Sequence, residues 1–145
     1  MLKINQLFLS PLNSNIEARN PKQIIMTEKD SKSKTYDLEE RTLEFAKRVN
    51  AYVNKLPKTI TNIENGKQLT RASGSVGANY IEANEALSKK DFLMRIRISR
   101  KEVKESRYWL HLTEPSKDEI KEKDYLIDEA TQLMNIFGSI LIKSK

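Results

Sequence analysis

The segment from residue 69 to residue 92 constrains the fold most, because it combines a helical repeat with many small residues. Gly74 and Gly77 lie inside that repeat, where each glycine costs about 1 kcal/mol relative to alanine. Close approach of another helix would offset that cost, so the segment predicts a tightly packed helical bundle. The repeat alternates four- and three-residue steps, which place its members on one helix face: Leu69, Ser73, Val76, Tyr80, Ala83 and Leu87.

The same repeat recurs in three other segments, and no segment of useful length has the two-residue period of a strand. The expected helices cover residues 38–56, about 59–87, and 89–113, with a fourth that opens at Ser116 or Lys117. Pro57 and Pro115 end the first and third helices, and Ser88 is the expected N-cap of the third. Inward-facing side chains are expected to be Leu38, Thr42, Phe45, Val49, Tyr52 and Leu56 in the first helix, Phe92, Ile96, Ser99, Val103, Ser106 and Leu110 in the third, and Leu126, Ala130, Leu133, Phe137 and Ile140 in the fourth.

Short connections between these helices make neighbouring helices antiparallel. We therefore predict an all-α fold, an antiparallel up-down-up-down four-helix bundle over residues 37–145.

Residues 1–36 contain two prolines and polar clusters without periodicity, and they hold six basic and three acidic side chains. This composition predicts a flexible basic arm. A further hypothesis is that Met26 is the natural start, because a short polar leader into the first helix follows it.

Composition argues against several kinds of chemistry. The chain has no cysteine, which excludes disulfides and thiolate metal sites, and His111 is the only histidine. The sequence GSVG lacks the Gly-Lys-Ser/Thr of a phosphate-binding loop and lies inside a helical repeat. The apolar run at residues 133–142 is too short to cross a bilayer, and the N-terminus lacks the apolar core of a signal peptide. We expect a cytoplasmic, non-enzymatic protein without catalytic residues, metal or cofactor.

A line of basic residues follows the third expected helix, one residue out of phase with its apolar repeat. The formal net charge of the chain is +6, which favours polyanionic partners. Two interpretations stay open: the line contacts phosphates of RNA or DNA, or it pairs, within or between subunits, with acids such as Glu82, Glu85, Glu102 or Glu105. Tyr108 and Trp109 either stack on bases or, as their apolar neighbours favour, pack in the core or at a subunit contact. The candidate nucleic-acid-binding residues are Arg97, Arg100, Lys104 and Arg107, with His111 at the same spacing.

The second expected helix also predicts contact with another subunit. A four-helix protomer uses one face of each helix internally, so a remaining face of small residues suits a subunit contact. A polar line beside the apolar repeat is suited to fixing the register between helices. The candidate oligomer-interface residues are Ser73, Gly74, Gly77, Ala78, Asn79 and Glu82.

Three stretches together resemble a known family: YDLEERTLEFAKRV, QLTRASGSVGANYIEANEALSKKDF and RISRKEVKESRYWLHL. They are similar to the bacterial four-helix-bundle proteins named for open reading frames in 23S rRNA intervening sequences. The resemblance covers about residues 36–143, and its most specific elements are residues 71–79 with Glu82, residues 88–92, and Glu105, Ser106 and Trp109. It implies a left-handed bundle, a homopentamer and no known enzymatic activity. The family is also similar to the accessory protein of diversity-generating retroelements, a basic pentamer associated with nucleic acid and a reverse transcriptase.

Two functions follow as hypotheses. The first is a non-enzymatic homo-oligomer, pentameric by the resemblance, that binds RNA or DNA through repeated basic ridges. The alternative is a protein-interaction scaffold whose charges serve assembly alone. The expected partners are further copies of the chain, RNA or DNA, or another protein, and no membrane.

Overall fold

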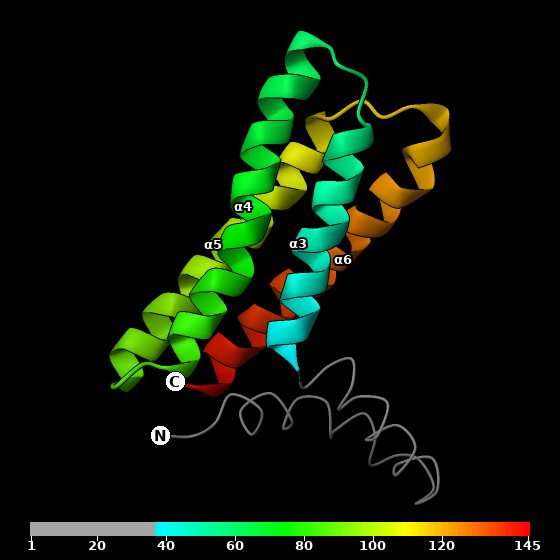
Figure 1. Cartoon of the computed structure of the whole chain (residues 1–145). Helices are drawn as coiled ribbons and strands as arrows, with labels where there is room; N and C mark the ends of the chain where they lie inside the picture. Colours follow the sequence, from blue (N-terminus) through cyan, green and yellow to red (C-terminus); the bar gives the residue numbers. More distant parts are fainter. Residues whose placement is uncertain (1–36) are drawn as a thin grey trace, which may run out of the picture.

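The computed structural model describes residues 37–145 as four long helices and a short 3₁₀ turn, η1. Consecutive helices run in opposite directions (Figure 1), so the prediction of an all-α four-helix bundle is confirmed. The expectations for residues 1–36, a flexible arm and a start at Met26, lie outside the described residues. The elements are α3 (Leu38–Lys55), α4 (Ile60–Asn84), α5 (Lys89–Leu112), η1 (Lys117–Glu119) and α6 (Ile120–Lys143).

Three of the helices begin at side-chain caps that the sequence encodes. The side chains of Asp37, Thr59 and Ser88 each accept a hydrogen bond from a backbone N–H three residues later, at 3.0, 3.2 and 3.1 Å. Such a cap satisfies one of the free N–H groups of the first helical turn. The predicted N-cap at Ser88 is therefore confirmed. The fourth helix is preceded by the 3₁₀ turn η1, which begins at Lys117, whereas α6 begins at Ile120.

The core contains every residue of the four predicted stripes except Leu87. Leu87 is 98% exposed, so its prediction as a core residue is wrong. The reason is that α4 ends at Asn84, and the chain then turns toward Ser88, which takes Leu87 out of the helical repeat. Small polar side chains in the core are hydrogen-bonded: Ser99 Oγ donates across the α4–α5 contact to the carbonyl of Val76 at 2.9 Å.

The close approach expected from the glycines occurs inside the chain, between α3 and α4. A Cβ added at Gly77 would lie 2.8 Å from Thr42 Oγ1, and one added at Gly66 would lie 3.1 Å from Val53 Cγ1. Both distances are shorter than ordinary van der Waals contact. Glycine at these two positions therefore allows α3 to lie directly on α4.

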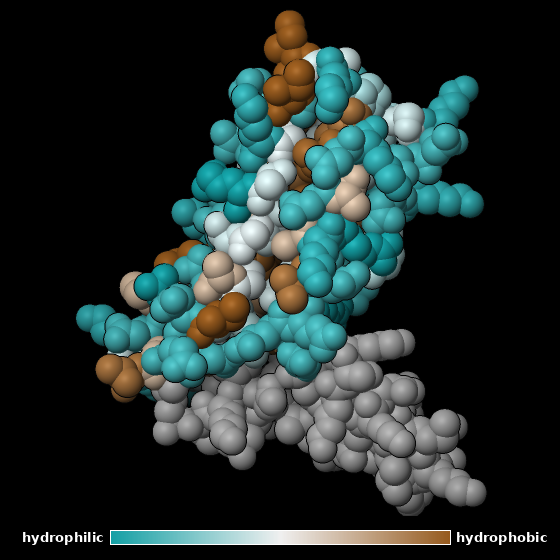
Figure 2. All heavy atoms as spheres, in the orientation of Figure 1, coloured by the Kyte–Doolittle hydropathy of each residue, from teal (hydrophilic) through white to brown (hydrophobic). Residues whose placement is uncertain are grey.

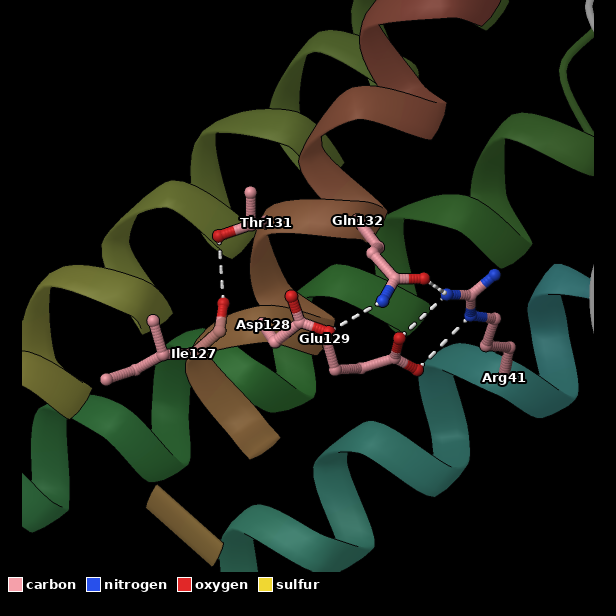
Figure 3. Close-up of polar contacts among 6 residues, drawn as sticks. All are labelled: Arg41, Ile127, Asp128, Glu129, Thr131 and Gln132. Carbon is pink, nitrogen blue, oxygen red and sulfur yellow. Dashed lines mark hydrogen bonds and ion pairs between the residues drawn. The ribbon is translucent and has the colours of Figure 1, made fainter. Parts of the chain in front are cut away.

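The bundle closes where α3 meets α6, which is the least extensive contact between neighbouring helices. Charged side chains reinforce this contact. Figure 3 shows Arg41 of α3 reaching the carboxylate of Glu129 and the side-chain oxygen of Gln132 on α6. The guanidinium of Arg48 lies 3.6 Å from the ring centroid of Tyr125. The ion pairs on this side are Arg41–Glu129 at 2.7 Å, Arg48–Glu122 at 2.9 Å and Lys55–Glu119 at 3.3 Å.

One buried side chain joins the two connections at the same end of the bundle. Asn62 Nδ2 donates to the carbonyl oxygens of Pro57 and Glu114, both at 2.9 Å. Asn62 Oδ1 in turn accepts from the backbone N–H of Glu114, also at 2.9 Å. Asn62 therefore fixes the α3–α4 connection against the segment that follows α5.

Candidate nucleic-acid interface

The basic residues of α5 border a groove of about 560 Å³ on the outer surface of the helix. Arg97, Arg100 and Lys104 are exposed there, and none of them belongs to the four ion pairs found within residues 37–145. Their charges are therefore available to a ligand. We call this feature the basic groove; it is lined by Arg97, Arg100, Lys101, Lys104, Glu105, Tyr108, Trp109 and Leu141.

Arg107, the fourth predicted residue, lies elsewhere. It is half-buried, and its Nη1 donates to Thr131 Oγ1 of α6 at 3.2 Å. Thr131 is held in place because its hydroxyl donates to the carbonyl of Ile127 at 2.9 Å, as Figure 3 shows. Arg107 therefore joins α5 to α6 and does not line the groove.

Lys101 lines the groove, although the sequence prediction passed over it. A signal was present: residues 97, 101, 104 and 108 alternate four- and three-residue steps, which is the spacing of one helix face. The sequence prediction instead chose the line of basic residues that includes Arg100 and Arg107. That line lies closer to the buried side of α5. Arg100 also lines the groove and lies beside Gly138 of α6, where an added Cβ would be 3.7 Å from Arg100 Nε, an ordinary van der Waals distance.

Two adjacent aromatic side chains occupy one end of the basic groove. Tyr108 is 59% exposed, whereas Trp109 is half-buried and packs against the core. Their ring centroids lie 5.1 Å apart at an interplanar angle of 76°, an edge-to-face arrangement. The expectation of core packing therefore does not hold for Tyr108, since its ring faces solvent, and a subunit contact at Tyr108 stays a prediction.

Glu102 lies on the opposite flank of α5 and is buried. Burial raises the pKa of its carboxyl, and the nearby Glu105 carboxylate raises it further. Glu102 Oε2 and Trp109 Nε1 are the two buried side-chain polar atoms without a hydrogen-bond partner in the described part of the chain. Within residues 37–145, Glu102 forms no ion pair with the arginines of the basic groove, and its pairing with an arginine of another subunit stays a prediction.

The six candidate oligomer-interface residues occupy different surroundings. Ser73 is fully buried in the protomer, and Gly77 lies against Thr42. Asn79 Oδ1 accepts from Arg95 Nη1 at 3.0 Å, so this side chain joins α4 to α5. Gly74, Ala78 and Glu82 are exposed, and nothing lies within 4 Å of a Cβ added at Gly74. Their participation in a subunit contact stays a prediction.

Exposed apolar side chains accompany these small residues. Leu43 of α3 and Ile63 and Ile81 of α4 are each about half exposed. Figure 2 presents the side of the molecule formed by α3 and α4, where a pale stripe runs along α4 with brown side chains beside it. This α3–α4 face therefore combines a stripe of small residues on α4 with exposed apolar side chains.

Residues 37–145 hold no group of three or more His, Cys, Asp or Glu side chains placed to bind a metal ion. None of the helices in that range combines the length and the apolar character that crossing a membrane requires. The fold and the basic groove together define a small four-helix-bundle protein with a positively charged outer groove.

The comparison with protein families gives a more specific assignment. Residues 34–138 match the model of the 23S rRNA-intervening sequence protein family, and the chain belongs to this family. The chain is also similar to a crystal structure, at 1.70 Å resolution, of a protein with unknown function from the S23 ribosomal protein family of Bacteroides thetaiotaomicron VPI-5482. The two share 28% sequence identity with a TM-score of 0.60, over 72% of this chain and 94% of the other. No curated protein matches the chain.

Proposed function

We propose that this protein is a cytoplasmic, non-enzymatic homo-oligomer that binds RNA or DNA through the basic groove, with a pentamer as the expected assembly. The observation that supports the proposal most directly is the group of exposed basic side chains on α5, Arg97, Arg100 and Lys104, which have no ion-pair partner within residues 37–145. Unpaired arginine and lysine side chains along one surface are the usual means of binding phosphates. The net charge of +6 adds a general attraction to polyanions.

Assembly would multiply this effect. One protomer offers only a few phosphate contacts, and each contact is weak and screened by salt. Several protomers in one particle present several grooves to the same strand, so that weak contacts add up to useful affinity. Binding should then depend strongly on salt and little on base sequence.

A charge-removal experiment tests nucleic-acid binding. Fluorescence anisotropy with labelled RNA and DNA is measured between 50 and 300 mM salt, with a double variant, Arg97→Gln and Lys104→Gln. If both side chains contact phosphates, the affinity should fall and the slope of log K against log salt should decrease by about 1.4–1.8. The matched control is Lys47→Gln with Lys121→Gln, which removes equal charge from exposed positions on α3 and α6. No binding by the wild type at 50 mM salt, or an equal loss in the control, would refute the proposal.

The α3–α4 face supports the self-association part of the proposal. Exposed Leu43, Ile63 and Ile81 on α3 and α4, together with the open space at Gly74, suit a contact between helices of different subunits. Light scattering should give an oligomer for the wild type and smaller particles for Ile81→Glu. Ile120→Glu is the control, because Ile120 is similarly exposed at the start of α6. A monomeric wild type at micromolar concentration would refute assembly. An oligomer that binds no nucleic acid would favour the alternative, a protein-interaction scaffold.

A further inference from the structure

We infer that the basic groove selects single-stranded over double-stranded nucleic acid, because an unpaired base stacks on the exposed ring of Tyr108. This inference rests on the proposed function and adds the class of ligand. The argument uses the arrangement of the groove along α5, where basic side chains are followed by an aromatic one.

The ring of Tyr108 is largely exposed to solvent and has a neighbouring ring beside it in the protomer. The edge-to-face contact with Trp109, at 5.1 Å between centroids, supports the ring from one side. Trp109 is itself half-buried against the core, so the pair is anchored to the bundle. At 59% exposure, Tyr108 retains free ring surface. An exposed, anchored aromatic ring beside basic side chains is the usual stacking platform for single strands.

The charges divide the groove into two parts. Arg97, Arg100, Lys101 and Lys104 supply positive charge at one end, whereas Glu105 adds a carboxylate beside Tyr108. The carboxylate repels phosphate, so a bound strand should keep its backbone at the basic end and turn a base toward the aromatic end. Leu141 adds an apolar side chain to the wall.

The dimensions of the groove fit a short piece of a single strand. From Arg97 to Tyr108 the helix rises about 16 Å, at 1.5 Å per residue. Bases in a duplex are paired and stacked on one another, so a duplex offers phosphates to the basic end but no free base to Tyr108. The two forms should therefore bind with different affinities.

The test uses the full-length protein and two probes of known structure, a 15-nucleotide oligouridine and a 15-base-pair RNA duplex, both at 100 mM salt. Trp109 is the only tryptophan of the chain, so its intrinsic fluorescence reports on the groove directly. We expect oligouridine to change this fluorescence and to bind at least 10-fold more tightly than the duplex.

Variants of Tyr108 separate stacking from charge. Tyr108→Leu should weaken oligouridine binding about 5- to 150-fold, which corresponds to the loss of one stacked base, and should leave duplex binding unchanged. Tyr108→Phe keeps the ring and should bind within about threefold of the wild type. Tyr125→Leu is the control, since Tyr125 is an exposed tyrosine on α6 outside the groove. Circular dichroism and light scattering on each variant confirm that fold and assembly are retained.

The outcomes distinguish this inference from the proposed function. Equal binding of both probes, or an unchanged affinity of Tyr108→Leu for oligouridine, would refute single-strand selection while leaving nucleic-acid binding intact. Binding of neither probe would refute the proposed function and the inference together. Because the comparison of the two probes uses wild-type protein, it decides the question even if a variant fails to fold.

Discussion

The substitution Gly77→Ala adds one methyl group, and this group has two opposite effects on the free energy of unfolding. Alanine is the better helix former by about 1 kcal/mol, which favours Gly77→Ala. The new Cβ, however, would lie 2.8 Å from Thr42 Oγ1 and 3.3 Å from Thr42 Cβ. Thr42 is fully buried, and its hydroxyl donates to the carbonyl of Leu38 at 2.6 Å, so a shift of this side chain would disturb a buried hydrogen bond. Overpacking of this kind costs about 1–3 kcal/mol, and the expected net result is destabilisation by about 1 kcal/mol.

Gly74→Ala is the matched control on the same helix. Nothing lies within 4 Å of its added Cβ, so only the helix-propensity gain of about 1 kcal/mol should remain. The two substitutions are therefore expected to differ by about 2 kcal/mol and to have opposite signs. If Gly74 lies in a subunit contact, the gain should be accompanied by dissociation in light scattering.

Urea denaturation followed by circular dichroism, repeated at several protein concentrations, measures these differences. A double-mutant cycle with Thr42→Ala isolates the clash, because removing the Thr42 hydroxyl and methyl should make Gly77→Ala neutral or stabilising. The reasoning is refuted if Gly77→Ala is as stable as Gly74→Ala, or if the cycle shows no coupling between residues 42 and 77.

Three other predictions follow from the polar contacts. Arg41→Gln should lower the free energy of unfolding by about 1–2 kcal/mol in urea, because Arg41 makes two hydrogen bonds to the half-buried Glu129 carboxylate; Lys67→Gln, which removes an exposed pair, should change it by less than about 0.5 kcal/mol. Burial raises the pKa of Glu102, so the folded protein prefers the protonated carboxyl. The resulting stabilisation is fully present below the unfolded pKa of about 4.3 and is lost as pH rises through the folded pKa. Glu102→Gln should therefore exceed the wild type in thermal stability at pH 8 and lose that advantage at pH 4; an equal difference at both pH values would contradict this. Asn62→Leu removes three hydrogen bonds and should cost about 2–4 kcal/mol by urea denaturation, and a loss below about 1 kcal/mol would count against its bridging role.

The fold could be predicted from sequence because burial in a helical bundle follows the helix period. Residues such as Phe45 and Phe137 recur with that period and are buried as expected. Leu87 has the same four- and three-residue spacing but is exposed, because the helical period does not specify where a helix ends. The end of α4 at Asn84 depends on the local backbone conformation of the turn that leads to Ser88.

The candidate site was predictable only in part, because the sequence shows which helix carries charge but not what lies opposite each side chain. Arg107 and Lys101 illustrate this limit. Arg107 has a partner in Thr131, a residue 24 positions away on α6, whereas Lys101 faces the groove. Gly77 shows the same limit for packing: its small size correctly indicated a close approach, yet the partner is α3 of the same protomer.

The hydrogen bonds of Asn62 have a consequence for the dynamics of the bundle. One amide side chain holds the α3–α4 connection and the segment after α5, so these two segments should open together in a single local unfolding event. The backbone N–H of Glu114 is protected by this side chain although it lies outside any helix, so its hydrogen exchange reports that event. The end of the molecule that carries Asn62 should consequently fray as one cooperative unit, in contrast to ordinary loops, which exchange residue by residue.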